Sequence, residues 1–553
     1  PEVPKYGGEF VGCAAEAPYT FDDCYGAPSD GILLQATNER LVAGDWAKGP
    51  AGSNEYDFMV SGFLIMPTTG YLAESWEVPD DNTFIFHIRK GAHFALNPQS
   101  EASRLVGGRE MTAEDVAFSI TRQYKDVPKA YGATNTHGWF QSATVPDKYT
   151  VVVKGDSEAW PTTNTFVRMV NQVHIVPPEV VKKYGDMRDW RVSCGTGAWM
   201  LVDYMPGSSA KLIKNPNYWM YDPLHPENQL PYMDEQTWLF IKDRSTRMAA
   251  LRTGKVDRIA QMKDDAGLSP EEMGSLLRSN PDLQSAPCIT QRSTISMRVD
   301  RPELPFHDTR VRQALAMGID RQAILRDYYQ GQGELITWPS APAFAPDGFT
   351  PYEKLPPDIK ELFDYQPEKA KSLLAEAGYP NGFKTSVICS NNENEIDLLS
   401  IVTDYWSKIG VDLTLDVKES AVFTSIQKAK THEEMLYYAP TVGSALILVT
   451  LQPGHRRNTC MCDDPYINER FEQIWATENI DNRRKRYNAL NEVHLYALEQ
   501  TFCIGLPSNQ IYTVWQPWVQ NYHGELTVGY GAYTNFTNYI WLDQDMKKQM
   551  TGK

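Results

Sequence analysis

The sequence predicts an α/β fold in two lobes, and three observations lead to this prediction. The chain has 553 residues, and at roughly 100 to 200 residues per domain it can form three or four domains. A strand, a helix and a second strand follow one another between residues 385 and 417, which is the order of a parallel β-α-β unit. The short stretch Val256–Ile259 follows a closed helix and indicates where the chain crosses from the first lobe into the second.

The first part of the chain carries strand and turn patterns. Residues 5–11 predict a short strand, and the apolar residues within 32–42 predict a helix that leads to the wall of the first lobe. Residues 68–94 predict a β-hairpin, because a turn signal at residues 80–82 precedes the alternating stretch Thr83–Ile88.

A helix is predicted to begin at Thr112. Threonine caps helix N-termini, and Asp115, three positions later, completes a start that resembles a capping box. Val116, Ile120 and Tyr124 follow at helical spacing and line one face. We expect this face to pack inward.

Two further strands are predicted over residues 195–219, joined by a turn at residues 206–208. The glycines of this segment match neither the phosphate-binding loop nor the dinucleotide-binding spacing. A helix over residues 246–252 then ends at Gly254, before the crossing into the second lobe.

The second lobe alternates helices with strands. Helical spacing predicts helices over residues 311–319 and 366–378. The elements predicted after them are a strand at 385–388, a helix at 396–409, a strand at 411–417, a helix at 422–430 and a strand at 435–437. This order predicts a parallel sheet with helical crossovers.

The charge balance argues against a nucleic-acid partner. The chain has 53 Lys and Arg against 70 Asp and Glu, a formal net charge of −17, so it repels a polyanion unless a basic stripe is present. The densest basic run, Arg483–Arg486, fits a solvated helix face. We therefore expect no nucleic acid to bind.

Apolar runs and the start of the chain bear on its location. The longest apolar run, Val442–Leu451, is about half of the 20 or so residues that a membrane-spanning helix needs, so we expect no span. The chain begins at Pro1 without an initiator Met. We expect this of a chain from which an export signal peptide has been removed.

The cysteines predict neither a metal site nor a cofactor. Eight cysteines allow 105 pairings and are compatible with either redox compartment. Cys13 and Cys24 flank one short N-terminal loop and are the first pair to test for a disulfide. Cys460 and Cys462 with His455 resemble at most half of a zinc site, because zinc usually takes four ligands with wider cysteine spacing.

Six segments, taken together and in order, resemble one known family. They are LAESWEVPDDNTFIFHIRKGAHF followed by MTAEDVAFSI, then GTGAWMLVDYMPGSSAKLIKNPNYW, ALRTGKVD, PFHDTRVRQALAMGIDRQAI, YQPEKAKSLLAEAGYPNGF and WSKIGVDLTL. Over nearly its whole length the chain is similar to the extracytoplasmic solute-binding proteins of ABC importers, family 5, typified by oligopeptide-, dipeptide- and nickel-binding members. Between Phe94 and Met111, where the family has a short turn, this chain carries an insertion that we expect on the surface.

The resemblance implies a two-lobed, periplasmic-binding-protein-like fold with an additional small domain and a hinge. We expect the first lobe at residues 1–45, 166–258 and 508–553, the additional small domain at residues 46–165, and the second lobe at residues 259–507. The resemblance also implies a monomer, periplasmic or lipid-anchored at the cell surface, that closes over a small-molecule ligand and delivers it to an ABC permease in the membrane.

An enzyme is the least favoured hypothesis. The sequence contains no G-x-S-x-G elbow and no H-E-x-x-H motif. A hydrolase that uses the same cleft therefore stands behind the two binding hypotheses that follow, and we name no catalytic residue.

The expected ligand depends on charged anchors. The resemblance implies that peptide-binding members use an Asp for the peptide's amino terminus and an Arg for a ligand carboxylate. These positions fall on Val442 and Gln427, and the accompanying Trp position falls on Ala439. Because buried charges need partners, the loss of both favours a neutral polar ligand such as an oligosaccharide. The alternative is a peptide with other anchors, for example an Arg in the insertion.

Aromatic faces and uncharged hydrogen-bonding groups suit a sugar. The candidate ligand-binding residues combine aromatic rings in polar or Pro/Gly-rich contexts with uncharged polar groups near the predicted cleft: Trp46, Trp139, Trp338, Gln427, Tyr438, Thr441 and Asn38. Asp22 and Asp23 also fit a place in the cleft, although the capping of a surface turn explains them equally well.

Overall fold

The structure, a computed structural model, divides into two compact units. It describes residues 3–18, 20–26, 32–59, 68–136, 138–260, 267–288, 293–342, 348–438, 450–455, 457–476 and 482–552. The first unit comprises Pro1–Cys288, Trp475–Ile480 and Ile511–Lys553. The second unit comprises Ile289–Ile474 and Asp481–Gln510.

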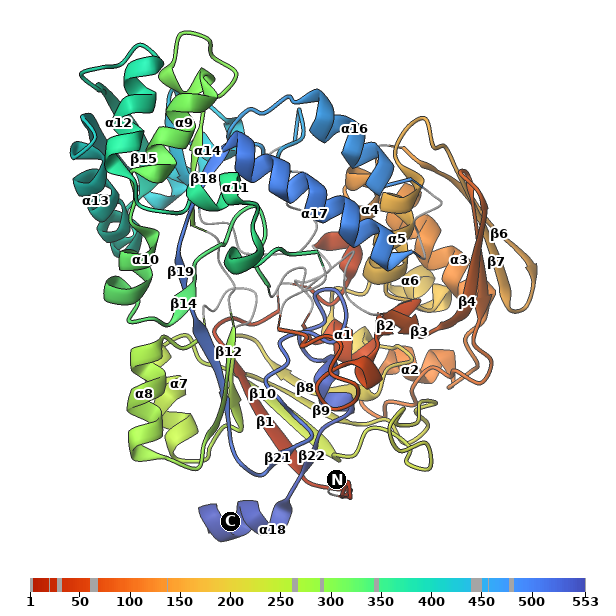
Figure 1. The fold of residues 1–553 in the computed structure, drawn as a ribbon. Helices are drawn as coiled ribbons and strands as arrows, with labels where there is room; N and C mark the ends of the chain where they lie inside the picture. Colours follow the sequence, from red (N-terminus) through yellow and green to blue (C-terminus); the bar gives the residue numbers. More distant parts are fainter. Residues whose placement is uncertain are drawn as a thin grey trace. The chain divides into compact units, whose positions relative to one another are not determined.

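A seven-stranded mixed sheet lies at the centre of the first unit (Figure 1). Its strands, in spatial order, are β12 (Gln284–Cys288), β20 (Ile511–Trp515), β11 (Arg258–Ile259), β1 (Glu9–Ala14), β10 (Glu235–Phe240), β9 (Ser209–Lys214) and β8 (Trp199–Met205). β1 runs parallel to β10 and β11, and the remaining neighbours are antiparallel. The sheet therefore joins segments from both ends of the chain.

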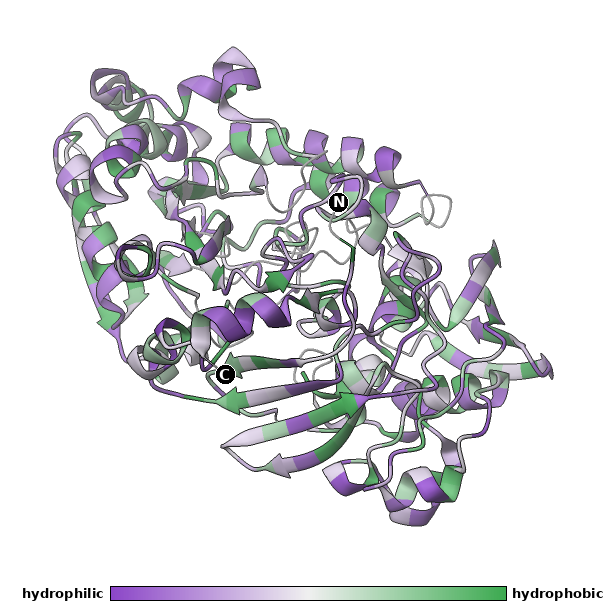
Figure 2. Ribbon diagram, turned by 90° about the horizontal axis from the view of Figure 1, so that it is seen from below, coloured by the Kyte–Doolittle hydropathy of each residue, from purple (hydrophilic) through white to green (hydrophobic). Residues whose placement is uncertain are grey.

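The strands of this sheet bury one face in an aromatic core. β10 alternates half-buried and buried residues, and hydrophilic and hydrophobic colours follow one another along the strands in Figure 2. Trp238 of β10 is fully buried and meets Phe10 edge to face at 6.1 Å between ring centroids. Gly12 of β1 lies under the Trp238 indole, and a Cβ there would come within 2.8 Å of the ring. The close approach of these strands therefore needs glycine at position 12.

A separate four-stranded antiparallel sheet lies in the same unit. Its order is β4 (Ala73–Asp80), β5 (Thr83–Ile88), β7 (Thr150–Gly155) and β6 (Phe140–Asp147). The predicted hairpin is confirmed, since β4 and β5 pair antiparallel and Asp80 Oδ1 accepts a hydrogen bond from the Asn82 N–H at 2.8 Å in the turn.

Short helices complete the first unit. They are α1 (Leu34–Thr37), α2 (Glu101–Val106), α3 (Ala113–Thr121), α4 (Tyr131–Asn135), α5 (Thr162–Gln172), α6 (Pro178–Tyr184), α7 (Arg244–Arg252), α8 (Pro270–Ser279) and α18 (Gln544–Thr551). The predicted start of α3 is confirmed, because Asp115 Oδ2 accepts from the Thr112 N–H at 2.8 Å. The face carrying Val116 and Ile120 is fully buried.

Two predictions for the first unit differ from the structure. The helix expected over residues 32–42 is confined to α1, and the chain then forms β2 (Val42–Gly44), which pairs with β3 (Thr68–Gly70). The first strand lies at Glu9–Ala14 and not at residues 5–11. A run of apolar residues indicates that a segment is buried, but it does not indicate how long a helix is. Here the pairing of β2 with β3 determines where α1 ends.

The insertion between Phe94 and Met111 forms α2. Ser100 caps this helix by accepting from the Ser103 N–H at 3.2 Å. Leu105 is 43% exposed, whereas Ala102 is fully buried. The inserted segment therefore presents one face to solvent and packs the other.

The second unit is built on a five-stranded sheet. The order is β16 (Val411–Lys418), β15 (Phe383–Ser390), β17 (Met435–Tyr438), β13 (Ser293–Met297) and β18 (Cys503–Leu506). The predicted β-α-β unit is confirmed: α13 (Glu393–Ser407) connects β15 to the parallel β16. The parallel arrangement predicted for these strands is confirmed for β15, β16 and β17, but β13 pairs antiparallel with both β17 and β18, so the sheet as a whole is mixed.

Helices of the second unit surround an apolar core. Besides α13 they are α9 (Thr309–Met317), α10 (Arg321–Ala323), α11 (Pro357–Glu361), α12 (Pro367–Glu376), α14 (Ser420–Ala429), α16 (Pro465–Ile474) and α17 (Arg483–Gln500). Trp406 of α13 is fully buried and donates from Nε1 to the Leu315 carbonyl at 3.0 Å. Two short ladders, β14 (Gly333–Glu334) with β19 (Ser508–Asn509) and β21 (Val519–Gln520) with β22 (Trp541–Leu542), lie in the second and first units.

The boundaries of the two units differ from the expected lobes in three segments, since Trp475–Ile480 belong to the first unit and residues 508–510 to the second. Residues 259–288, which we expect in the second lobe, contribute α8 and β12 to the first unit. The division into two lobes and an additional small domain stays a prediction. No helix in the described parts of the chain is long and apolar enough to cross a membrane.

The packing of Gly12 gives a stability test. We expect Gly12→Ala to lower the free energy of unfolding by about 1–3 kcal/mol, because the new methyl overlaps the Trp238 ring. Gly274→Ala in α8 is the matched control and should raise stability by about 0.5–1 kcal/mol, because alanine favours a helix interior. Urea denaturation followed by circular dichroism measures both, and equal stability of the two variants would contradict this packing.

Candidate functional site

A buried ion pair fixes the N-terminal segment of the first unit. Arg122, directly after α3, donates from Nη1 and Nη2 to the two carboxylate oxygens of Asp22 at 2.8 and 2.6 Å. The Met187 N–H donates to the same carboxylate at 2.9 Å, and neither charged side chain is more than 5% exposed. Burial alone would lower the pKa of Arg122, but the hydrogen bonds to Asp22 raise it above its ordinary value.

Beside this pair, three side chains form a hydrogen-bonded chain. Asp23 Oδ2 lies 3.2 Å from His174 Nδ1 and accepts the His174 backbone N–H at 2.8 Å. Arg40 Nε donates to His174 Nε2 at 3.0 Å, and Arg40 Nη1 donates to the Tyr530 carbonyl at 2.6 Å. Because arginine can only donate, His174 Nε2 must be the acceptor, and the ring proton lies on Nδ1 toward Asp23.

Electrostatics hold this chain in one protonation state. Burial and the neighbouring Arg40 charge lower the pKa of His174 to about 4, although Asp23 offsets part of the shift. Burial would raise the pKa of Asp23, but the His174 hydrogen bond lowers it overall. Burial lowers the pKa of Arg40 to about 10, with Asp23 opposing. Near neutral pH, Asp23 is therefore a carboxylate, His174 a neutral imidazole and Arg40 a guanidinium cation.

Arg40 and His174 border a small pocket of about 10 Å³, room for about one water molecule, that is partly open to solvent. The polar residues that line it are Gln35, Asn38, Glu39, Arg40, Tyr71 and His174. The far wall comes from the C-terminal segment: the Gln35 side chain donates to the Gly531 carbonyl at 2.5 Å and accepts from the Tyr533 N–H at 2.9 Å. The pocket is therefore formed between the α1–β2 segment and residues 528–535.

Glu39 is the second charged residue at this pocket, and its carboxylate points to another cluster. Tyr218 Oη donates to Oε1 at 2.7 Å, and Trp219 Nε1 donates to Oε2 at 2.9 Å. Burial raises the pKa of Glu39, while the Trp219 and Tyr218 hydrogen bonds oppose the rise. The Arg40 guanidinium brings a cation to the same wall. Such a wall suits an anionic group such as a carboxylate.

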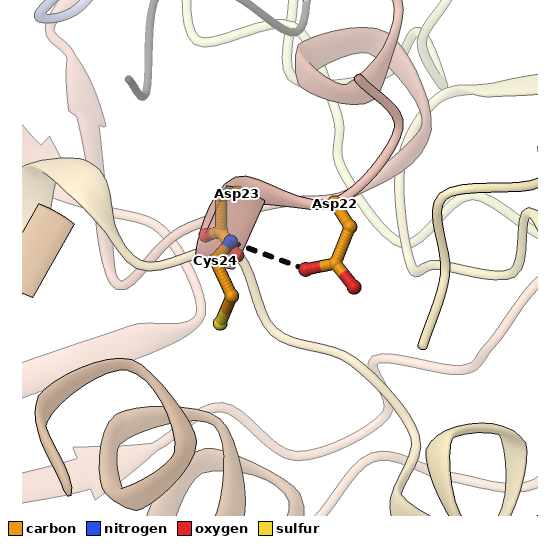
Figure 3. Close-up of side chains that lie close together, drawn as sticks. All are labelled: Asp22, Asp23 and Cys24. Carbon is orange, nitrogen blue, oxygen red and sulfur yellow. Dashed lines mark hydrogen bonds between the residues drawn. The ribbon is translucent and has the colours of Figure 1, made fainter. Parts of the chain in front are cut away.

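Asp22, Asp23 and Cys24 lie close enough together to be considered as a metal site (Figure 3). Asp22 Oδ1 accepts from the Cys24 backbone N–H at 3.1 Å and from Arg122, and Asp23 accepts from His174. Burial and the Asp23 charge hold the pKa of the Cys24 thiol far above its usual range. The carboxylates already serve cationic and N–H donors and the thiol resists deprotonation, so this group is an ion-pair network and not a metal centre. Both aspartates are buried, and Asp22 caps the short 3₁₀ helix Asp23–Tyr25 by accepting from the Cys24 N–H.

The three predicted tryptophans lie in apolar cores. Trp46 is 1% exposed and stacks on Tyr539 at 4.7 Å between centroids. Trp139 is fully buried, stacks on Phe84 at 4.7 Å and donates from Nε1 to Thr162. Trp338 of the second unit is 4% exposed. Both faces of a ring in such packing are largely occupied, which explains why a polar sequence context did not indicate exposure.

The remaining predicted residues are not gathered in one place. Asn38 lines the Arg40 pocket, but it donates to the Ile175 and Cys194 carbonyls at 3.1 and 3.2 Å. Gln427 is 8% exposed in α14 of the second unit. Tyr438 ends β17 and is half-buried. Thr441 lies outside the described residues, as do positions 439 and 442, on which the peptide anchors of the family fall.

The insertion does not supply a free cationic anchor. Arg109 forms bidentate contacts with Asp115 and with Glu179, at 2.6–2.9 Å. Arg104 donates to the Pro98 carbonyl at 3.0 Å. Both arginines therefore stabilise the inserted segment itself.

Sequence analysis missed Glu39, Arg40 and His174. A signal was present: Glu39 and Arg40 stand between the apolar stretches 32–36 and 41–43, and His174 stands among Val173, Ile175 and Val176. Charged residues enclosed by apolar sequence are rarely buried unless paired. That pattern predicts a buried polar network, although it cannot say which residues pair.

Comparisons with known proteins agree with the two-lobe resemblance. Residues 68–440 match the sequence profile described as "bacterial extracellular solute-binding proteins, family 5 Middle". Heme-binding protein A of Haemophilus influenzae is 28% identical over 440 residues, covering 73% of this chain and 69% of that protein. The periplasmic oligopeptide-binding protein OppA of the same species is 24% identical over 482 residues, covering 81% and 82%. The structure of HbpA2 from Haemophilus parasuis matches with a TM-score of 0.75 at 22% identity, covering 97% and 100%.

His174 makes stability depend on pH. In the unfolded chain a histidine binds a proton below its ordinary pKa of about 6.5, whereas folded His174 stays neutral down to about 4. Between these values the unfolded state binds more protons, so stability is lost as the pH falls. We expect this residue to remove about 2 kcal/mol of stability between pH 7 and pH 5.

The measurement is urea denaturation at pH 7 and pH 5 for the wild type and for His174→Gln. The variant should lose about 2 kcal/mol less than the wild type over this interval. His93→Gln, at an exposed position of the same unit, is the control and should behave like the wild type. An unchanged pH slope in His174→Gln would show that this histidine is not held neutral.

Proposed function

Since the chain belongs to the bacterial extracellular solute-binding proteins, family 5, we propose that it binds peptides for an ABC importer. The family consists of binding proteins and not enzymes, and the role of substrate-binding protein of an ABC importer follows from membership. The peptide ligand is the part that we propose. It replaces the neutral oligosaccharide favoured by the sequence alone.

The observation that carries the proposal is the similarity to OppA, a protein named for binding oligopeptides, and we propose the Arg40 guanidinium at the small pocket as the group that meets the peptide's carboxylate. A peptide with a free C-terminus offers at least one carboxylate, whereas a neutral oligosaccharide offers none. A guanidinium can bind a carboxylate through two parallel hydrogen bonds in a partly desolvated site. The name of the similar OppA, an oligopeptide-binding protein, supports the same class of ligand.

The argument for a sugar rested on missing charges at two positions. Gln427 replaces the expected arginine, and Val442 the expected aspartate. A ligand carboxylate needs a cation in the site but not at a fixed sequence position, and Arg40 offers one from the first unit. The insertion-borne arginine that we considered does not, because Arg109 is already bound to two carboxylates.

Haem is the second candidate ligand. It is favoured by one observation, the similarity to a protein named heme-binding protein A. Haem carries two propionate carboxylates, so a guanidinium anchor suits it as well. The tests below therefore include haemin beside peptides.

Further features belong to this proposal. We propose the two-lobed arrangement with an additional small domain and a hinge, a monomeric state, and delivery of the ligand to an ABC permease. We also propose a periplasmic location or a lipid anchor at the cell surface, since the similar OppA is described as periplasmic. Size-exclusion chromatography with light scattering tests the monomer.

A thermal-shift screen tests the class of ligand. We expect di- to pentapeptides to raise the melting temperature and neutral oligosaccharides to leave it unchanged. A ligand at 100 times its Kd stabilises the folded state by about 2.7 kcal/mol, which is easily detected. A shift with oligosaccharides alone would overturn the peptide proposal, and a shift with haemin alone would favour the second candidate.

The proposed role of Arg40 as the anchor for a peptide's C-terminal carboxylate is tested first by modifying the peptide. For a peptide that shifts the melting temperature, we expect its C-terminal amide to bind at least about ten-fold more weakly than its free acid, because a buried charge loses its partner. Isothermal titration calorimetry measures both Kd values. In Arg40→Gln the acid and the amide should bind alike, which isolates the pairwise interaction.

Arg188→Gln is the control, because Arg188 is an exposed arginine of the same unit whose side chain is 59% exposed. It should preserve the preference for the acid. Equal affinity of acid and amide for the wild-type protein would show that no cation anchors the C-terminal carboxylate, even if the Arg40 variant failed to fold.

A further inference from the structure

Three cysteines of the second unit lie in one buried neighbourhood. All eight cysteines of the chain are free thiols and buried, including Cys13 and Cys24, which we considered as a disulfide. Cys460 and Cys462 are each 1% exposed, and Cys503 of β18 is 7% exposed. These three influence one another electrostatically, which makes them a group that the binding function does not use.

One hydroxyl brings Cys503 next to the segment that carries Cys460. Cys503 pairs with Ser296 across β18 and β13, and its thiol donates to Ser296 Oγ at 3.5 Å. The hydroxyl of Thr459 donates to the same Ser296 oxygen at 2.8 Å. The Cys460 carbonyl accepts from the Val299 N–H at 3.1 Å. The segment at residues 459–460 is therefore held against the edge where Cys503 lies.

A buried cation faces the group. Arg312 of α9 is 3% exposed, and it donates to the carbonyls of Gln500, Phe306 and His307 and to the Thr309 hydroxyl, at 2.8–3.0 Å. These acceptors are neutral. A buried guanidinium with neutral acceptors favours an anion nearby, and the cysteine sulfurs are within its electrostatic reach.

The thiols of Cys460 and Cys503 have pKa values that are shifted in opposite directions. A hydrogen bond from the Cys503 thiol lowers the pKa of Cys460, and burial opposes this, while the Cys462 N–H and Arg312 add to the lowering. Burial and the same hydrogen bond raise the pKa of Cys503. Cys462 has a raised pKa from burial and the Cys460 charge, and its backbone bonds to Asn458 instead. Both sulfurs act as donors in the structure, Cys460 to Asn458 Oδ1 at 3.4 Å and Cys503 to Ser296 Oγ at 3.5 Å, so Cys460 is a thiol that loses its proton more readily than its neighbour.

We propose that Cys460 and Cys503 form a reversible disulfide that fastens the segment around Cys460 to strand β18. The pair has the arrangement that thiol–disulfide exchange requires, a nucleophilic sulfur beside a second thiol. The chain belongs to an extracellular family, whose members meet oxidising conditions in which such bonds persist.

The oxidant is a low-molecular-weight disulfide. Cys460 loses its proton, attacks one sulfur atom of the oxidant as a thiolate, forms a mixed disulfide and releases one thiolate. The Cys503 sulfur then attacks Cys460, loses its proton and releases the second thiolate. Two protein thiols are oxidised, two electrons reduce the disulfide, and the protons of Cys460 and Cys503 pass to the two released thiolates.

The experiment refolds the full-length chain from urea with glutathione disulfide or with a reducing agent. The number of alkyl groups that the denatured protein takes up, measured by mass spectrometry, should be two fewer after oxidation than the eight of the reduced chain. Non-reducing peptide mapping by mass spectrometry should identify one cross-linked species joining the peptides of Cys460 and Cys503. The urea midpoint of the oxidised protein should exceed that of the reduced protein, because the bond restricts the unfolded chain.

Matched variants separate this pair from its neighbour. Cys460→Ser and Cys503→Ser should each abolish the cross-link and the gain in midpoint, whereas Cys462→Ser should retain both. Retention of all eight thiols by the wild type after oxidation, or a cross-link that joins other cysteines, would overturn the proposal. This result is read on the wild type, so it stands even if a serine variant fails to fold.

Discussion

The requirement that a buried charge be paired controls the first unit. Asp22 and Arg122 lie 100 positions apart in the sequence, and the Met187 N–H completes their contact. Removal of one partner from such a pair leaves an uncompensated charge in a medium that solvates it poorly, at a cost of about 3–5 kcal/mol. The N-terminal segment, α3 and the chain at residue 187 therefore hold their places together.

The same requirement forms the pocket. Asp23 fixes the orientation of His174, which in turn accepts from Arg40, while Arg40 and Gln35 bind the carbonyls of Tyr530 and Gly531. Four separate segments of the chain thus meet at one polar chain of contacts. A guanidinium placed this way is oriented before any ligand arrives, which reduces the entropy that binding costs. The guanidinium that we propose as a ligand anchor is therefore held by the same contacts that pair the buried charges.

Local patterns predicted the elements whose cause is local. The turn at residues 80–82, the capping box of Thr112 and the β-α-β unit from β15 to β16 each depend on a few neighbouring residues, and all are confirmed. The prediction of a helix over residues 32–42 was wrong because residues 42–44 pair with β3, which is distant in the sequence, and form a strand. The antiparallel β13 in the second sheet likewise depends on pairing that no local pattern contains. A single sequence does not show which strands pair when long loops separate them.

The site was harder to predict than the fold, because its residues are recognised by their partners. Trp46 and Trp139 resembled ligand-stacking residues in their sequence context, yet Tyr539 and Phe84 occupy their faces. Arg40 drew no attention because its significance depends on His174, 134 positions away. The positions at which relatives carry charged anchors mislead in the same way. The neutral Gln427 shows that this position does not bind a carboxylate through a cation, but another position can still supply one. Charge complementarity belongs to the whole site, so no single aligned position decides between a peptide and a sugar.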